Sequence, residues 1–135
     1  MSLAHSNGEP GGADAALAEG VEHYKAGRAE EAARALERAK TMRRGDVRAH
    51  SYLGAAYYRL RRYHEAAEEF RQAAALKGDD PRVFFNLGNA YLGCGLPAQA
   101  RDAFAAALRA DPNYVAALFP LASLERMLGA GTLET

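Results

Sequence analysis

The chain has 135 residues, of which 49% are hydrophobic and 25% are charged, and its 17 basic side chains balance 17 acidic ones. This length suits one domain with its own core, and the composition excludes a wholly disordered chain. Net neutrality argues against a general nucleic-acid or membrane-surface binder. A single cysteine, Cys94, excludes an internal disulfide, and no apolar stretch is long enough for a signal peptide or a membrane span. We therefore expect a cytoplasmic protein.

Apolar residues recur at spacings of three and four along most of the chain, which predicts helices and no strands. Seven segments have this spacing: 15–26, 29–39, 49–60, 64–77, 83–93, 98–110 and 115–128. Gly27 and Gly95 are placed to end helices, and Gly45-Asp46 and residues 78–81 each supply a stop followed by an N-cap. Connections this short should make neighbouring helices antiparallel.

The same residue types return every 34 residues, which indicates an internal repeat. Gly20, Gly54 and Gly88 form one series, and Ala122, another small residue, lies 34 residues further on. Three other series have the same step: Ala32, Ala66 and Ala100; Leu36, Phe70 and Phe104; Ala39, Ala73 and Ala107. The small residues allow two antiparallel helices to approach closely, while the large ones fill the space beside them.

Two stretches of the chain carry a known repeat pattern. They are His50-x2-Leu53-Gly54-x2-Tyr57 with Ala66-x3-Phe70-x2-Ala73, and Phe84-x2-Leu87-Gly88-x2-Tyr91 with Ala100-x3-Phe104-x2-Ala107 and Pro112. This pattern resembles that of the tetratricopeptide repeat (TPR) family. The first repeat fits least well, with His23 where tyrosine is expected and Arg44 where proline is expected.

The resemblance implies an all-α fold, namely a right-handed superhelix of three helix-turn-helix units plus one additional C-terminal helix. The TPR domain is expected at 13–129, with repeats at 13–46, 47–80 and 81–114 and the extra helix at 115–129. Residues 1–12 are expected to form a disordered N-terminal tail, and residues 130–135 a C-terminal tail.

No constellation of side chains predicts an enzyme. The four histidines, His5, His23, His50 and His64, occur singly, and none has the i, i+4 partner of a helical zinc site. The run from Gly88 to Gly95 lacks the Lys-Ser/Thr of a phosphate loop and falls on a predicted helix. We therefore expect no catalysis, no metal and no cofactor, and interpret Cys94 as an incidental thiol, with a redox switch as the alternative.

A second stripe on the first helix of each unit predicts a binding surface. Residues there are aromatic, Arg-rich and Asn-rich, which is the composition of protein interfaces. The predicted peptide-binding residues are Tyr24, Arg48, Tyr52, Tyr58, Arg59, Arg82, Phe85, Asn86, Asn89 and Arg126. By resemblance these positions line a concave groove, in which Asn86 and Asn89 fall where asparagines hold peptides. The alternative is that some of the tyrosines only pack between units.

Residues 38–62 contain eight basic side chains and one acidic one, Asp46. This excess has three interpretations, which are, in order of preference, solvated helix ends, an acidic peptide partner and RNA phosphate. Nucleic acid is therefore not the expected partner. TPR domains that clamp a C-terminal carboxylate need Lys and Asn at defined positions. The corresponding residues here are Leu17, Val21, Tyr52, Arg82 and Asn86, of which only Arg82 fits.

The last predicted helix has more apolar residues than one face can bury, which predicts self-association through 115–129 or contact with a partner. The chain is therefore interpreted as a scaffold or adaptor that binds a peptide or helical segment of a partner protein in the TPR groove. One alternative is a small cytosolic chaperone of a secretion apparatus. The other is a regulatory fragment of a larger enzyme or assembly factor.

Overall fold

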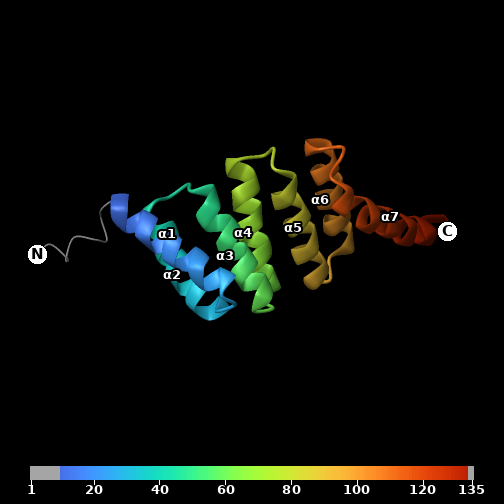
Figure 1. The fold of residues 1–135 in the computed structure, drawn as a ribbon. Coiled ribbons are helices and arrows are strands. Elements are labelled where there is room, and N and C mark those ends of the chain that lie inside the picture. Colours follow the sequence, from blue (N-terminus) through green and yellow to red (C-terminus); the bar gives the residue numbers. More distant parts are fainter. Residues whose placement is uncertain (1–9, 134–135) are drawn as a thin grey trace, which may run out of the picture.

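The structure is a computed structural model that describes residues 10–133. Within this range the chain forms seven α-helices and one short 3₁₀-helix, and no strand. They are α1 (Pro10–Lys25), α2 (Ala29–Met42), α3 (Val47–Arg59), α4 (Tyr63–Leu76), α5 (Pro81–Gly93), α6 (Pro97–Ala110), η2 (Val115–Ala117) and α7 (Leu118–Leu133). Figure 1 shows the helices following one another in chain order from one end of the molecule to the other. The prediction of an all-α protein is confirmed.

The helices are arranged as a solenoid of pairs (Figure 1). Each helix packs mainly on the next helix in the chain, and the first helices of successive pairs also touch, α1 with α3 and α3 with α5. The second helices α2, α4 and α6 begin at residues 29, 63 and 97, so the elements repeat with the 34-residue step seen in the sequence. First helices therefore share one side of the molecule.

Close packing within each pair depends on glycine. A Cβ atom at Gly54 would lie 2.8 Å from the ring of Phe70, and one at Gly88 would lie 2.6 Å from the ring of Phe104. Both rings are almost completely buried. The first pair follows the same rule, with Gly20 against Leu36, although its sequence pattern is the weakest.

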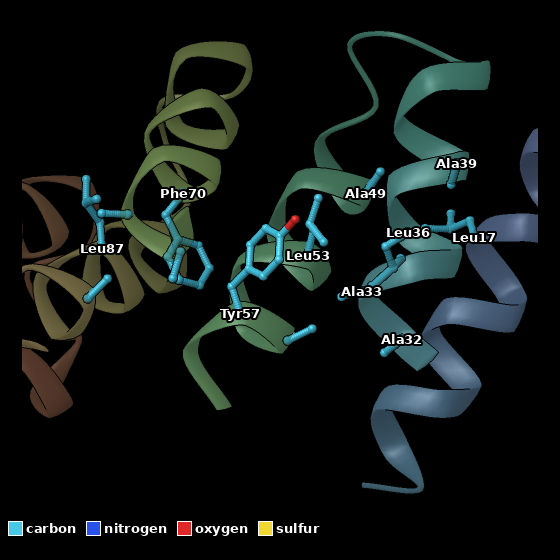
Figure 2. Packing of buried hydrophobic residues seen from close by; sticks show 14 of the residues in the cluster. Leu17, Ala32, Ala33, Leu36, Ala39, Ala49, Leu53, Tyr57, Phe70 and Leu87 are labelled. Atoms are coloured by element: carbon cyan, nitrogen blue, oxygen red, sulfur yellow. The ribbon is translucent and has the colours of Figure 1, made fainter. Parts of the chain in front are cut away.

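Buried side chains form two clusters that follow the solenoid. The larger one extends from α1 to α6 and includes Leu17, Leu36, Leu53 and Phe70 (Figure 2). The smaller one lies beneath α6, η2 and α7 around Phe104. Each cluster is shared between neighbouring pairs, so stability is expected to accumulate from interfaces between neighbours rather than from a single central core.

The turn inside each pair needs a left-handed residue. Gly27 and Gly95 have φ angles of 84° and 75°, as their predicted role requires, and the equivalent residue of the second pair is Arg61, with φ 62°. Arginine is not a helix-stop signal, so the sequence analysis did not mark this position. The repeated geometry, rather than the local residue, imposes this conformation.

Both ends of the helical region differ from the prediction. Helix α1 begins at Pro10 and α7 continues to Leu133, so residues 10–12 and 130–133 are helical rather than parts of tails. A proline in the first turn is compatible with a helix because its missing N–H has no partner there. The rest of the two predicted tails lies outside the described residues. The helix predicted from 115 starts with the 3₁₀ turn η2, and α7 then carries Pro120 in its own first turn.

Candidate functional site

Three adjoining hollows run along the first helices. The largest, about 1090 Å³, lies on α1 and reaches Arg48 and Tyr52 of α3. The second, about 490 Å³, is also lined by Arg48 and Tyr52 and extends to α5. The third, about 260 Å³, shares Tyr24, Ala55 and Asn86 with the second. Because neighbouring hollows share lining residues, they form one continuous depression, which we call the groove.

Eight of the ten predicted binding residues line the groove. They are Tyr24, Arg48, Tyr52, Tyr58, Arg59, Arg82, Asn86 and Asn89. Phe85 instead packs its ring 5.6 Å from that of Phe104 and 5.7 Å from that of Tyr114, so it belongs to the smaller buried cluster. Arg126 lies exposed on α7 and lines none of the three hollows.

Several aromatic rings of the groove also join neighbouring units. Tyr24 and Tyr52 meet edge to face with their ring centroids 5.8 Å apart. The guanidinium of Arg59 lies 4.1 Å from the centroid of the Tyr24 ring and donates a hydrogen bond of 3.2 Å to the Tyr24 carbonyl. Within the second unit, Tyr58 contacts Tyr63 in the same edge-to-face manner, with ring centroids 5.2 Å apart. These side chains are thus held in place by packing while one side of each remains on the groove.

Asn86 and Asn89 differ from the tyrosines because they are half-buried in the groove wall without a side-chain partner. Within the described residues, neither amide makes a side-chain hydrogen bond to another part of the chain. An amide offers two donors and one acceptor oxygen, which matches the alternating groups of an extended peptide backbone. Half-buried groups of this kind gain more from a ligand hydrogen bond than fully solvated groups.

Two arginines at the groove edge are held by helix-capping aspartates one repeat apart. Asp46 and Asp80 each accept a hydrogen bond from the backbone N–H two residues later and begin α3 and α5. Arg48 Nη2 lies 3.0 Å from Asp46, and Arg82 Nη2 lies 3.1 Å from Asp80. The hydrogen bond from Arg82 lowers the pKa of Asp80, so this carboxylate stays ionised. Both arginine side chains remain mostly exposed.

The basic stretch at 38–62 is less positive in the fold than in the sequence. Five of its eight cations pair with carboxylates: Arg38 with Glu19, Lys40 with Glu37 and Glu69, Arg43 with Asp14 and Asp46, Arg48 with Asp46, and Arg62 with Glu65. Most of these acids come from outside the stretch. Folding therefore compensates much of the local excess, and the expectation of an acidic partner rests on the exposed arginines at the groove edge rather than on the charge count of the stretch.

A buried polar cluster between α2, α3 and α4 was not predicted. Glu69, only 6% exposed, accepts a hydrogen bond of 2.9 Å from Lys40 and lies 2.8 Å from Nδ1 of His50. Tyr57 donates to Glu37, which also pairs with Lys40. Burial alone would lower the pKa of Lys40, but the hydrogen bond and charge of Glu69 raise it. Every member has a partner within the chain, so the cluster is structural.

The position of Glu69 contains a signal that it is buried. Glu69 lies three residues after Ala66 and four before Ala73, both of which are in the buried series of the repeat. A charged residue on that face needs a buried partner, and Lys40 one unit earlier supplies it.

Other reactive groups of the described residues do not form a site. Cys94 is half-buried at the end of α5, and burial raises the pKa of its thiol, which disfavours the reactive thiolate. Among residues 10–133 no three His, Cys, Asp or Glu side chains gather as a metal site would require. In the same range, no helix combines the length and the apolar character needed to cross a bilayer.

Two family models, both described as Tetratricopeptide repeat, match residues 17–81 and 57–124. A search of curated proteins finds no match to the chain. Among solved structures, the first TPR of Spaghetti (RPAP3), bound to the HSP90 peptide SRMEEVD, is 20% identical, with TM-score 0.81, and the match covers 87% of this chain and 93% of that one.

Two other solved structures show the same fold. The Yersinia enterocolitica type III secretion chaperone SycD, in complex with a peptide of the translocator YopD, is 18% identical with TM-score 0.78, over 83% of this chain and 91% of that chain. MamA is 19% identical with TM-score 0.85, over 90% of this chain and 71% of that chain. At these identities the similarity shows a shared fold.

Proposed function

This chain belongs to the tetratricopeptide repeat family, and on that premise we propose that it is a protein-interaction module whose groove binds an extended peptide segment of a partner protein. The observation that carries the proposal is the pair of unpartnered amides, Asn86 and Asn89, in a hollow with Tyr24, Tyr58 and Arg59. Rigid aromatic and arginine side chains supply contact area at low entropic cost, and the amides fix the peptide backbone.

Two similar structures support this proposal. The RPAP3 TPR domain was solved with an HSP90 peptide, and SycD was solved with a YopD peptide. TPR domains are in general non-catalytic interaction modules, and we propose that role here without any enzymatic activity.

The proposal is tested with peptides selected on the immobilised protein from a random display library. Their affinities are measured by fluorescence anisotropy for the wild type and for the double variant Asn86→Ala/Asn89→Ala. We expect the double variant to bind about tenfold or more weakly, because each lost hydrogen bond costs about 0.5–1.5 kcal/mol. Gln99→Ala, which truncates an exposed amide on α6 outside the groove, is the matched control. Selected peptides that bind the double variant and the wild type equally would refute the groove assignment.

We also propose that α7 mediates self-association. Four large apolar side chains of the segment formed by η2 and α7 are strongly exposed, with Phe119 76% and Val115 71% accessible, together with Leu118 and Met127. An exposed apolar stripe of this kind is typical of a contact surface. Sedimentation equilibrium is expected to show dimers or larger species that Phe119→Glu converts to monomers. A wild-type protein that is monomeric at every concentration would contradict the proposal.

A further inference from the structure

The groove changes its chemical character from one repeat to the next. Two positions in each first helix line the groove: one lies two residues before the packing glycine and the other lies one residue after it. They are occupied by Ala18 and Val21 in α1, Tyr52 and Ala55 in α3, and Asn86 and Asn89 in α5. Equivalent positions are therefore apolar in the first unit, mixed in the second and amide-bearing in the third. The glycine between them is constant, so the change spares the glycine contact, although Val21, Tyr52 and Ala55 also pack against the larger core cluster.

The hollow on α1 is suited to an apolar side chain. Leu17, Ala18 and Val21 line it together with the ring of Tyr52, and with about 1090 Å³ it is the largest of the three hollows. Val21 is half-buried and packs against the larger core cluster, so this wall is fixed before a ligand arrives. Five charged residues also line the hollow, namely Asp14, Glu22, Lys25, Arg28 and Arg48. A single large apolar side chain can thus be buried between α1 and α3, with polar groups around it.

The middle hollow is suited to a negative charge. Arg48, Lys77 and Arg82 line it together with Asp80, and Asp46 pairs with Arg48, so three cations face two carboxylates. The aspartates engage the Nε and Nη2 atoms of Arg48 and Arg82, which leaves the Nη1 group of each guanidinium for a second acceptor. An arginine that is already oriented loses less side-chain freedom when it binds a carboxylate.

Resting on the proposed function, we infer that the groove selects an internal peptide segment that combines one large apolar side chain with neighbouring acidic side chains. The apolar side chain occupies the hollow on α1, the acidic side chains face Arg48 and Arg82, and the backbone is held by Asn86 and Asn89. A free C-terminus is not required, because Leu17 and Val21 stand where a carboxylate clamp needs Lys and Asn.

The test uses dodecapeptides selected from a random display library and synthesised with amidated C-termini. In the peptides, the apolar residue is replaced by serine and the acidic residues by their amides. In the protein, Val21→Asn changes the hollow on α1 and Arg82→Gln changes the middle hollow. Arg71→Gln is the matched control, because Arg71 forms an exposed ion pair with Glu68 on α4, away from the groove. Far-UV circular dichroism and melting curves verify that each variant is folded.

We expect each peptide substitution to weaken binding by about tenfold. Val21→Asn should reduce the affinity of the parent peptide by a similar factor but leave that of the serine peptide unchanged. Arg82→Gln should weaken binding and reduce its salt dependence, while Arg71→Gln should do neither. Amidated peptides should bind as tightly as peptides with a free carboxylate.

Failure of this inference is distinguishable from failure of the proposed function. If the peptides lose affinity for Asn86→Ala/Asn89→Ala but bind Val21→Asn and Arg82→Gln as tightly as the wild type, the groove binds peptides and the inferred selectivity is wrong. Selected peptides that are basic, or that need a free C-terminus, also overturn the selectivity. Peptides that bind the Asn double variant as tightly as the wild type refute the groove itself.

Discussion

Arg61 is expected to destabilise the second turn, and replacing it with glycine should stabilise the protein. Its φ angle of 62° lies in the left-handed region, at the position where the first and third pairs have Gly27 and Gly95. A side chain with a Cβ atom is strained in that region, whereas glycine adopts it freely. Arg61 is exposed, so the substitution removes no buried contact.

The size of the effect follows from two opposing terms. Relief of the left-handed conformation contributes about 1–2 kcal/mol, and the greater freedom of glycine in the unfolded chain costs about 0.5–1 kcal/mol. Arg61→Gly should therefore raise the free energy of unfolding by about 0.5–1 kcal/mol. For a domain of this size, the midpoint of thermal unfolding should rise by about 2–4 °C.

Urea denaturation followed by circular dichroism measures this difference, and Gly95→Arg is the matched control. A Cβ atom at Gly95 would meet no neighbour within 4 Å, so that substitution introduces backbone strain without a clash. It should lower the free energy of unfolding by about 1 kcal/mol or more. The reasoning is refuted if Arg61→Gly destabilises the protein, or if Gly95→Arg has no effect.

Three further substitutions test the packing and the electrostatics. Gly88→Ala should lower the free energy of unfolding by about 1–2 kcal/mol in urea denaturation, because the new Cβ overlaps a buried ring, whereas Gly129→Ala, with no neighbour within 4 Å, should not. Glu69→Gln should cost about 1–3 kcal/mol by the same assay, since it removes the buried carboxylate that pairs with Lys40 and His50. The pKa of Asp80 is lowered by Arg82, so its contribution to stability is present above about pH 4 and is lost as the pH falls through the lowered folded-state value. The free energy of unfolding of the Asp80→Asn variant, measured between about pH 5 and pH 2, should therefore fall less steeply with decreasing pH than that of the wild type.

The sequence predicts the helices and their pairing because packing repeats itself. Each pair needs a small residue where its two helices cross and a large residue opposite, and Gly54 with Phe70 and Gly88 with Phe104 satisfy this need at a constant step. A constraint that recurs three times is visible without any knowledge of tertiary structure.

Features that occur in only one unit were not predictable in the same way. Arg61 adopts a glycine-like conformation because the neighbouring units impose the turn, and Glu69 is tolerated in a buried position because Lys40 and His50 reach it from two other helices. Neither fact can be inferred from local propensity, since each depends on partners that are distant in sequence.

Eight residues of the predicted binding stripe line the groove, whereas Phe85 and Arg126 do not. Phe85 follows the spacing of the stripe, yet its ring is engaged by Phe104 and Tyr114 and contributes to packing. Arg59 lines the groove while it also lies over Tyr24. Helical periodicity predicts the direction in which a side chain points. Which neighbouring residue it then contacts depends on the next unit in space.

The contrast between constant and variable positions separates the packing glycines from the residues to which we assign the proposed peptide specificity. Gly20, Gly54 and Gly88 cannot change independently, because each one faces a large side chain of its own pair. The residue two positions before each glycine, Ala18, Tyr52 or Asn86, lies on the groove and differs in every unit. The glycine contact does not fix these positions, although Tyr52 also packs against Tyr24, so their residue types can be set in part by what the groove contacts. On the proposed function, the order from apolar to amide along the groove gives a bound peptide one preferred direction, which a uniform solenoid would lack.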